Sequence, residues 1–338
     1  LLATVCDVMP LRKLNRLIAL EVLKNFDIKK NLAINELFDL NEKKNKLNIN
    51  DLGYLIGPIL NAGGRLGKSS HASQLLSSDN LDIVNIKSIE LIKLNNRRKE
   101  IETLILDQID FQIIENENSN VIIYYNPNIN EGLIGIIAAR LKDYFNKPTI
   151  VITNSNELLK GSARSVYNYN IGRVIKNSLD NNIIISGGGH NMAAGFTLKK
   201  NNLKNFENYI LKDFYKTGAP QNNTFLYDAE VSSLAFNIDF YDDIKKLEPF
   251  GTGNPEPTFL LKELRVIKTT VLDNKHISLI LKSKRGFSIK SISFNSMNNK
   301  IGEYLLNYKK NLSVLGQINE NIWNNKKTLQ LTIRDVIL

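Results

Sequence analysis

The stretch Ser186-Gly187-Gly188-Gly189-His190-Asn191-Met192-Ala193-Ala194-Gly195 is the most informative part of this chain. It follows the apolar run 183–185, which predicts a buried strand, and precedes 196–198, which predicts another. Three glycines at a strand end allow unusual backbone dihedral angles and let a ligand approach bare N–H groups. The histidine after them brings a polar side chain to that open surface. Taken alone, the motif fits a ligand-binding loop and a glycine turn with a satisfied histidine equally well.

The composition is that of a folded protein with a basic surface. The 338 residues are 43% hydrophobic and 23% charged, which is typical of globular proteins and sufficient for two or three domains. The net charge of +10 favours an anionic partner, nucleic acid first. The single cysteine, Cys6, excludes an internal disulfide and a cysteine-rich zinc site, which suits a reducing cytoplasm. No apolar run reaches the ~18 residues that span a bilayer, and no signal peptide is visible.

The first ten residues begin without methionine, inside a stretch whose pattern predicts a buried strand. Domains rarely begin on a core strand that lacks a partner. We therefore expect that an N-terminal domain is cut through here.

The spacing of apolar residues indicates an α/β protein. Residues 30–83 predict short helices around a glycine-bearing loop at 57–67. Residues 85–114 predict a long amphipathic helix whose polar middle, 95–100, fits a solvated bridge between two domains. From residue 120, strands and helices alternate, which indicates a sheet with crossover helices.

The last third of the chain predicts a β-barrel. Its start, 248–257, is rich in proline and glycine and predicts a rigid linker or turn. Five strand-like segments follow, with a short helix at 301–308 after the third; the strands are expected at 259–272, 276–283, 287–294, 311–318 and 328–336. This is the layout of an OB-type barrel, a fold often used on single strands. A structural β-domain without a ligand is the alternative.

Five motifs in order carry a resemblance to a known family. They are Thr4-Val5-Cys6-Asp7-Val8-Met9-Pro10-Leu11, Gly57-Pro58-Ile59-Leu60-Asn61-Ala62-Gly63-Gly64-Arg65-Leu66-Gly67, Gly161-Ser162-Ala163-Arg164-Ser165, Ser186-Gly187-Gly188-Gly189-His190 and Pro249-Phe250-Gly251-Thr252-Gly253-Asn254-Pro255-Glu256-Pro257. Together they resemble the RecJ family, single-stranded-DNA-specific 5′-3′ exonucleases of the DHH phosphoesterase superfamily. The resemblance covers essentially the whole chain.

The resemblance implies four segments and an activity. The segments are the C-terminal part of a DHH domain (1–84), a bridging helix (85–118), a DHH-associated domain with the GGGH motif (119–218), and a linker with an OB-like domain (219–338). The implied activity is metal-dependent hydrolysis of phosphodiester bonds from a 5′ end, in DNA repair and recombination. Manganese is the expected metal and magnesium the alternative. The implied partner is single-stranded DNA, with a single-strand-binding protein or a helicase as further partners of a cytoplasmic monomer.

Asp7 matches a metal-ligating aspartate of the family. A hard divalent ion prefers carboxylate oxygen, and two such ions can clamp the attacking and leaving oxygens of a phosphodiester. An aspartate that caps a strand end is the alternative. The motifs for the other ligands, including Asp-His-His, are absent from this sequence. We therefore expect the chain alone to be catalytically inactive.

The resemblance also assigns residues to the DNA. Arg65, Ser162 and Arg164 match positions that bind the terminal 5′-phosphate and adjoining backbone, and Asn61 would orient Arg65 or the strand. Arginine presents a planar fork suited to phosphate oxygens, and a serine hydroxyl adds a donor; a surface ion pair is the alternative fate of either arginine. His190 matches the histidine beside the scissile phosphate, where it could donate to a non-bridging oxygen, and Gly188 and Gly189 would contact the backbone.

Ile129-Asn130 departs from the family pattern, which usually has Trp-His, and this puts a DNA contact there in doubt. Two other functions stay open. Another DHH phosphoesterase, acting on nano-RNA or cyclic dinucleotides, would share Asp7 and the GGGH motif but generally lacks the OB-like tail. The other is a non-catalytic single-strand-binding protein built on an inactivated RecJ fold.

Overall fold

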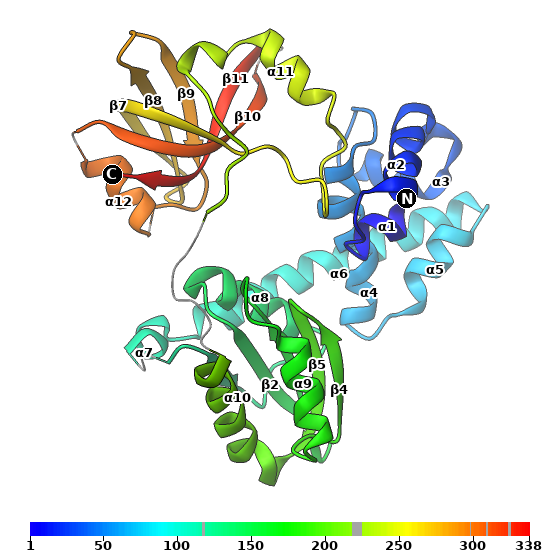
Figure 1. The fold of residues 1–338 in the computed structure, drawn as a ribbon. Helices are drawn as coiled ribbons and strands as arrows, with labels where there is room; N and C mark the ends of the chain where they lie inside the picture. The colour runs from blue at the N-terminus through cyan, green and yellow to red at the C-terminus, as the bar shows by residue number, and fades with distance from the viewer. Residues whose placement is uncertain (117–118, 218–224, 298, 309, 324–325) are drawn as a thin grey trace. The chain divides into compact units, whose positions relative to one another are not determined.

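The computed structural model describes residues 1–116, 119–217, 225–297, 299–308, 310–323 and 326–338. The chain divides into two compact units (Figure 1). Residues 27–223 form a helical segment followed by an α/β sheet, and residues 1–26 join 224–338 around a β-barrel. The mixed α/β fold ending in an OB-type barrel is confirmed. Among the described helices, none combines the length and apolar character that crossing a membrane requires.

The predicted glycine loop at 57–67 is wrong, because its first nine residues form helix α4 (Gly57–Arg65). Glycine here allows close packing: a Cβ on Gly63 would lie 2.5 Å from the Lys68 carbonyl oxygen and 3.2 Å from Leu91. Leu91 belongs to α6 (Leu81–Asp107). The neighbouring elements are η1 (Ile28–Lys30), α3 (Leu32–Leu40), η2 (Asp51–Ile56) and α5 (Ser70–Ser77).

The predicted bridging helix is two helices, α6 and α7 (Phe111–Asn116). Its polar centre is solvated on one side, where Asn96, Arg97, Lys99 and Glu100 are exposed, and buried on the other. Asn95 and Glu102 are only 5% and 6% exposed. Arg98 donates from Nε to Asn95 Oδ1 (3.2 Å) and from Nη1 to Glu102 Oε2 (2.9 Å). Buried polar groups are tolerated where they satisfy one another, and a one-dimensional pattern cannot show that pairing.

The α/β sheet has the strand order β1-β2-β3-β5-β4. Its strands are β1 (Ile122–Tyr125), β2 (Thr149–Ser155), β3 (Leu158–Arg164), β4 (Ser186–His190) and β5 (Ala193–Lys199). The parallel pair β1–β2 is joined through α8 (Ile134–Phe145), as the alternating pattern predicted, whereas the other pairs are antiparallel. One face buries the main core against α9 (Ile171–Asp180) and α10 (Leu203–Thr217) (Figure 1). The other face packs against α8 through Val151 of β2.

The glycines of the GGGH motif lie within strand β4, and the strand predicted at 183–185 is a bend instead. The expectation of unusual dihedral angles is also wrong, because the positive-φ glycines of the described chain are Gly67, Gly253 and Gly286. Close packing explains two of the three glycines. A Cβ on Gly187 would lie 2.8 Å from Ile184 Cδ1, and one on Gly189 would lie 2.3 Å from the Ala193 carbonyl oxygen.

The barrel follows the predicted layout. The strands β7 (Phe259–Leu272), β8 (His276–Ser283), β9 (Ser288–Ser293), β10 (Leu312–Trp323) and β11 (Lys326–Ile337) close through the additional pairing of β10 with β7, and a two-residue β6 (Ala229–Glu230) extends the sheet beside β7. Helix α12 (Lys300–Asn307) stands between β9 and β10, as expected. The apolar residues of alternating strand positions fill the interior, among them Leu261, Ile277, Val314 and Leu331.

The start of the chain is a helix, α1 (Leu2–Cys6), with no buried residue, so the predicted core strand is wrong. A strand needs a neighbour for its backbone groups, whereas a helix satisfies them internally. After it, α2 (Lys13–Asn25) docks on the segment that follows α11 (Ile238–Lys245). Arg16 donates to the carbonyls of Leu247, Glu248 and Pro249, and the Leu11 amide donates to the Thr252 carbonyl. The 248–257 turn is therefore a docking surface as well as a linker.

Candidate functional site

Three strands of the sheet, β3, β5 and β4, carry polar residues and glycines on the face opposite the α9–α10 core. Directly paired residues point to the same side of a sheet, so the strand pairing defines rows across it. The three rows run from β3 through β5 to β4 and are Arg164–Ala193–His190, Ser162–Gly195–Gly188 and Lys160–Thr197–Ser186. The residues between them, such as Ala163, Ala194 and Phe196, are buried in the core.

The middle row is a bare strip of backbone, which we call the glycine lane, formed by Gly195 and Gly188. No atom lies within 4 Å of a Cβ built on Gly188, and the nearest to one on Gly195 is the Gly161 carbonyl oxygen at 3.8 Å. The flanking rows lie about 6.6–6.8 Å to either side, two residues along each strand. A ligand can therefore approach the sheet closely along this lane.

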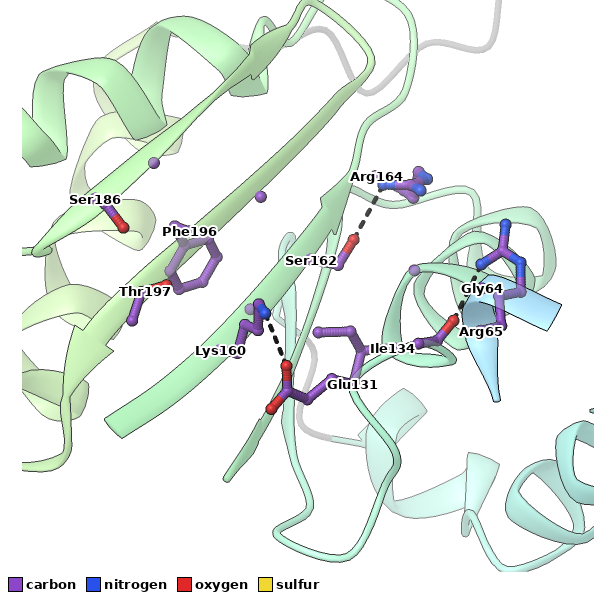
Figure 2. A pocket seen from close by; sticks show the side chains of 15 residues that line it. Gly64, Arg65, Glu131, Ile134, Lys160, Ser162, Arg164, Ser186, Phe196 and Thr197 are labelled. Carbon is purple, nitrogen blue, oxygen red and sulfur yellow. Dashed lines mark hydrogen bonds and ion pairs between the residues drawn. The ribbon is translucent and has the colours of Figure 1, made fainter. Parts of the chain in front are cut away.

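A pocket of about 530 Å³ lies at the β3 end of the glycine lane. Figure 2 shows Arg65 of α4 and Arg164 of β3 on its wall, with Ser162 between the strand and Arg164. The lining residues are Gly64, Arg65, Glu131, Gly132, Ile134, Gly135, Lys160, Gly161, Ser162, Arg164, Ser186, Gly187, Gly195, Phe196 and Thr197. The structure thus brings together residues that are far apart in the sequence and that carry three cations, one carboxylate and several hydroxyls.

Arg164 is held against the strand by its own neighbours. Its Nη1 donates to Ser162 Oγ (3.1 Å) and to the Ala163 carbonyl oxygen (2.8 Å). Burial lowers the pKa of the Arg164 guanidinium, and the charge of Arg65 lowers it further. At Gly135, near the start of α8, a Cβ would lie 3.0 Å from Arg164 Nη2 and 3.2 Å from Ser162 Oγ. Glycine at this position therefore keeps the guanidinium and hydroxyl accessible.

Arg65 reaches the same pocket from the end of α4. Its Nη1 donates to the Gly132 carbonyl oxygen at 3.0 Å. A Cβ on Gly132 would lie 2.2 Å from the Arg65 carbonyl oxygen, so only glycine permits this approach of two backbones. Burial lowers the pKa of Arg65, the charge of Arg98 lowers it further, and Glu102 acts in the opposite sense. The turn before Gly132 is stabilised by Asn130, whose Oδ1 accepts from the Gly132 amide (2.8 Å).

Glu102 is a residue that the sequence reasoning missed. Its Oε1 accepts from Arg140 Nε (2.7 Å) and its Oε2 from Arg98 Nη1 (2.9 Å). It thereby links α6 to α8 beneath Arg65. The signal in the sequence was the i, i+4 spacing of Arg98 and Glu102.

Glu131 and Lys160 were also missed, and both line the pocket. Lys160 Nζ donates to Glu131 Oε2 (2.7 Å), and Ser155 Oγ donates to Glu131 Oε1 (2.5 Å). Hydrogen bonding from Lys160, and then from Ser155, lowers the pKa of the Glu131 carboxyl, so it stays ionised at neutral pH.

The predicted site residues are placed as follows. Arg65, Ser162 and Arg164 line one pocket. Gly188 and His190 are exposed on the same sheet face, whereas Gly189 is turned toward the opposite face. Asn61 is exposed on α4 and is not a lining residue of this pocket. Asp7, the exposed C-cap of α1, belongs to the other unit.

The residues present do not make a metal centre. Within the described part of the chain, no group of three or more His, Cys, Asp or Glu side chains is placed to hold a metal ion. Asp7 alone offers too few oxygens for a divalent cation, which takes about six ligands.

The pocket carries the donors that an anionic group such as a phosphate requires. The charge of Arg65 raises the electrostatic cost of the charge on Arg164, which an anion bound beside them would relieve. A guanidinium fork and a neighbouring hydroxyl offer the donors that phosphate oxygens accept. The exposed glycine backbone next to them leaves room for a chain attached to that phosphate.

Comparisons with known proteins first identify two domains of the chain. Residues 118–216 match the DHHA1 domain and residues 227–335 match the RecJ OB domain. The chain therefore carries a DHHA1 domain and a RecJ OB domain. It is 30% identical to the single-stranded-DNA-specific exonuclease RecJ of Haemophilus influenzae, over 98% of this chain and 60% of that protein.

Two solved structures share the fold. The crystal structure of Thermus thermophilus RecJ in complex with Mn²⁺ has a TM-score of 0.83 and 23% identity, and covers 99% of this chain and 48% of its own. The Mg²⁺ complex of the same protein has a TM-score of 0.82 and 22% identity, over 100% of this chain and 51% of its own. The chain therefore spans 60% of the Haemophilus relative and about half of the solved chains.

Proposed function

We propose that this chain is the DNA-binding part of a single-stranded-DNA-specific 5′-3′ exonuclease. We also propose that its pocket binds the terminal 5′-phosphate. The observation that carries the proposal is the meeting of Arg65, Ser162 and Arg164 at one end of the glycine lane. The relative from Haemophilus influenzae bears the name of such an exonuclease.

The residues of this chain would bind and orient the strand. Arg65 and Arg164 would hold the terminal phosphate through charge-assisted hydrogen bonds, and Ser162 would add a donor. The next nucleotides would follow the glycine lane across β5 and β4, where exposed backbone allows close approach. His190, at the β4 end of the adjacent row, would donate to a phosphate oxygen as negative charge grows on it.

The chemistry of the proposal needs a divalent metal, with Mn²⁺ first and Mg²⁺ second. Such an ion, when bound, would polarise the phosphoryl oxygen. Asp7 is the proposed contribution of this chain to the metal, with the remaining ligands outside it. We further propose that the protein is a cytoplasmic monomer whose partner is a single-strand-binding protein or a helicase.

Binding and cleavage by the chain alone test the proposal. Single-stranded DNA with a 5′-phosphate should bind in a salt-sensitive way, with a log–log slope of roughly −0.7 for each phosphate neutralised. The same DNA should stay intact with Mn²⁺ or Mg²⁺, because the described residues form no metal centre. An affinity that is unchanged between low and physiological salt would contradict the binding, and release of mononucleotides by pure protein would contradict the account of the metal.

A non-catalytic single-strand-binding protein is the second candidate. The absence of a metal-binding cluster within the described residues is compatible with it. Addition of a fragment that carries the missing metal ligands separates the two, since only the exonuclease would regain cleavage.

A further inference from the structure

The pocket continues beyond the two arginines toward a wall of different character. Lys160 lies two residues before Ser162 on β3, a step of about 6.6–6.8 Å along the strand. It pairs with Glu131, and Thr197 and Ser186 complete its row on β5 and β4. All four residues line the same pocket (Figure 2).

This far wall carries no net positive charge. The ion pair is half-exposed, with side-chain exposures of 49% for Lys160 and 40% for Glu131, and both residues line the pocket. Ser155 and Lys160 both donate to the Glu131 carboxylate, which stays ionised. The two cations that remain available, Arg65 and Arg164, lie at the other end of the pocket.

We propose that Glu131 makes the terminal-phosphate site selective for a monophosphate over a 5′-di- or triphosphate. The inference rests on the proposed function, because it assumes that a 5′-phosphate binds at Arg65 and Arg164. A further phosphate group attached to the first would extend toward the Lys160 row. There it would meet an ion pair in which Glu131 already neutralises Lys160, so no free cation would offset the added negative charge.

Without Glu131, Lys160 would favour a 5′-di- or triphosphate. An unpaired lysine on this wall would attract additional phosphate groups as a compact cation. Glu131 holds that charge in a hydrogen bond at 2.7 Å and thereby removes it from the pocket. Selectivity in this chain would thus come from the neutralised cation on one wall as well as from the attractive arginines on the other.

The test compares three single-stranded DNAs of the same sequence, with a 5′-hydroxyl, a 5′-monophosphate or a 5′-triphosphate. Affinity is measured by fluorescence anisotropy of a 3′ label on the 338-residue chain. The unsubstituted chain should bind the monophosphate more tightly than either of the others. Glu131→Gln should raise the triphosphate-to-monophosphate affinity ratio roughly tenfold, and Lys160→Gln should lower it.

Glu157→Gln is the matched control, because Glu157 is exposed in the turn between β2 and β3 and is not a lining residue of this pocket. It should leave the ratio unchanged. A variant that is merely destabilised would lose affinity for all three DNAs alike.

The outcomes separate the inference from the proposal beneath it. Equal binding of the hydroxyl and monophosphate DNAs by the unsubstituted chain would overturn the phosphate site itself. A preference for monophosphate over hydroxyl, combined with equal binding of triphosphate or an unchanged ratio in Glu131→Gln, would overturn the role of Glu131 alone.

Discussion

Arg164 on β3 and His190 on β4 are both paired with the same residue, Ala193 of β5. They therefore share one row on one face of the sheet, two inter-strand spacings or about 9–10 Å apart. A terminal phosphate held by Arg164 and the adjoining nucleotides of the same DNA strand would both lie within reach of this row. The pairing connects the residue proposed to bind the end with the residue proposed to act in the reaction.

We expect Arg164→Ala to reduce the preference for a phosphorylated 5′ end. A charge-assisted hydrogen bond contributes about 1.5–3 kcal/mol, so affinity for 5′-phosphorylated DNA should fall roughly 10- to 100-fold. Affinity for 5′-hydroxyl DNA should fall much less. Binding measurements on both DNAs check this, with the exposed Arg97→Ala on α6 as the control. Equal losses would mean that Arg164 serves the backbone in general.

His190→Ala should lower turnover far more than it lowers DNA affinity or the melting temperature. His190 is exposed at the end of β4 and lies outside the packed core. Loss of a donor to developing negative charge costs roughly 2.7–4 kcal/mol, a hundred- to a thousand-fold in rate. Turnover per folded molecule should be measured after addition of the fragment that carries the missing metal ligands. Thermal unfolding of the same variant should be measured in parallel. A destabilised variant with normal turnover would assign His190 a structural role.

Substitutions at Gly188 and Gly189 should act in opposite ways. A Cβ on Gly188 meets no atom within 4 Å, so Gly188→Ala should leave the melting temperature unchanged or slightly higher while it weakens binding of single-stranded DNA. A Cβ on Gly189 would lie 2.3 Å from the Ala193 carbonyl oxygen, so Gly189→Ala should destabilise the sheet. Melting curves and anisotropy on both variants check this. Undiminished DNA binding by Gly188→Ala would mean that the strand does not follow the glycine lane.

Glu256→Gln should stabilise the barrel unit at neutral pH. Burial raises the pKa of the Glu256 carboxyl, against the hydrogen bond from Asn319 and the charge of Arg334. A raised pKa means that the protonated form favours folding below the unfolded pKa, and that this contribution is lost as pH rises through the folded pKa. The amide should therefore raise the melting temperature at pH 7–8 by about 1–2 °C, after allowance for solvent screening, and leave it unchanged near pH 4. A gain at both pH values would rule out ionisation as the cause.

The barrel could be predicted from the sequence because its strands alternate in hydrophobicity and are separated by turn residues. The same holds for β1, α8 and β2, whose apolar patterns are local. The pattern failed where tertiary pairing decides the outcome: one side of the polar part of α6 is buried because Arg98 pairs with both Asn95 and Glu102. Likewise, Gly57–Arg65 resembled a loop because helix propensity counts glycine as unfavourable, although Gly63 is needed for contact with α6.

The site shows the same division between local and tertiary signals. The motifs drew attention to Arg65, Ser162 and Arg164 because arginine and serine stand among small residues there. Glu131 and Lys160 stand in no such motif. Their pairing depends on the register of β2 against β3 and on the turn before α8, which spacing in the sequence does not show.

The close approach of Arg65 and Gly132 joins the helical segment to the sheet at the place where the phosphate is proposed to sit. If this junction opened, only one of the two arginines would stay in place. A bound 5′ end would contact both arginines at once. By thermodynamic linkage, its binding would therefore also stabilise the contact between Arg65 and Gly132. Any change that loosens α4 from Gly132 should weaken the grip on DNA to the same degree, without touching a single DNA-contacting atom.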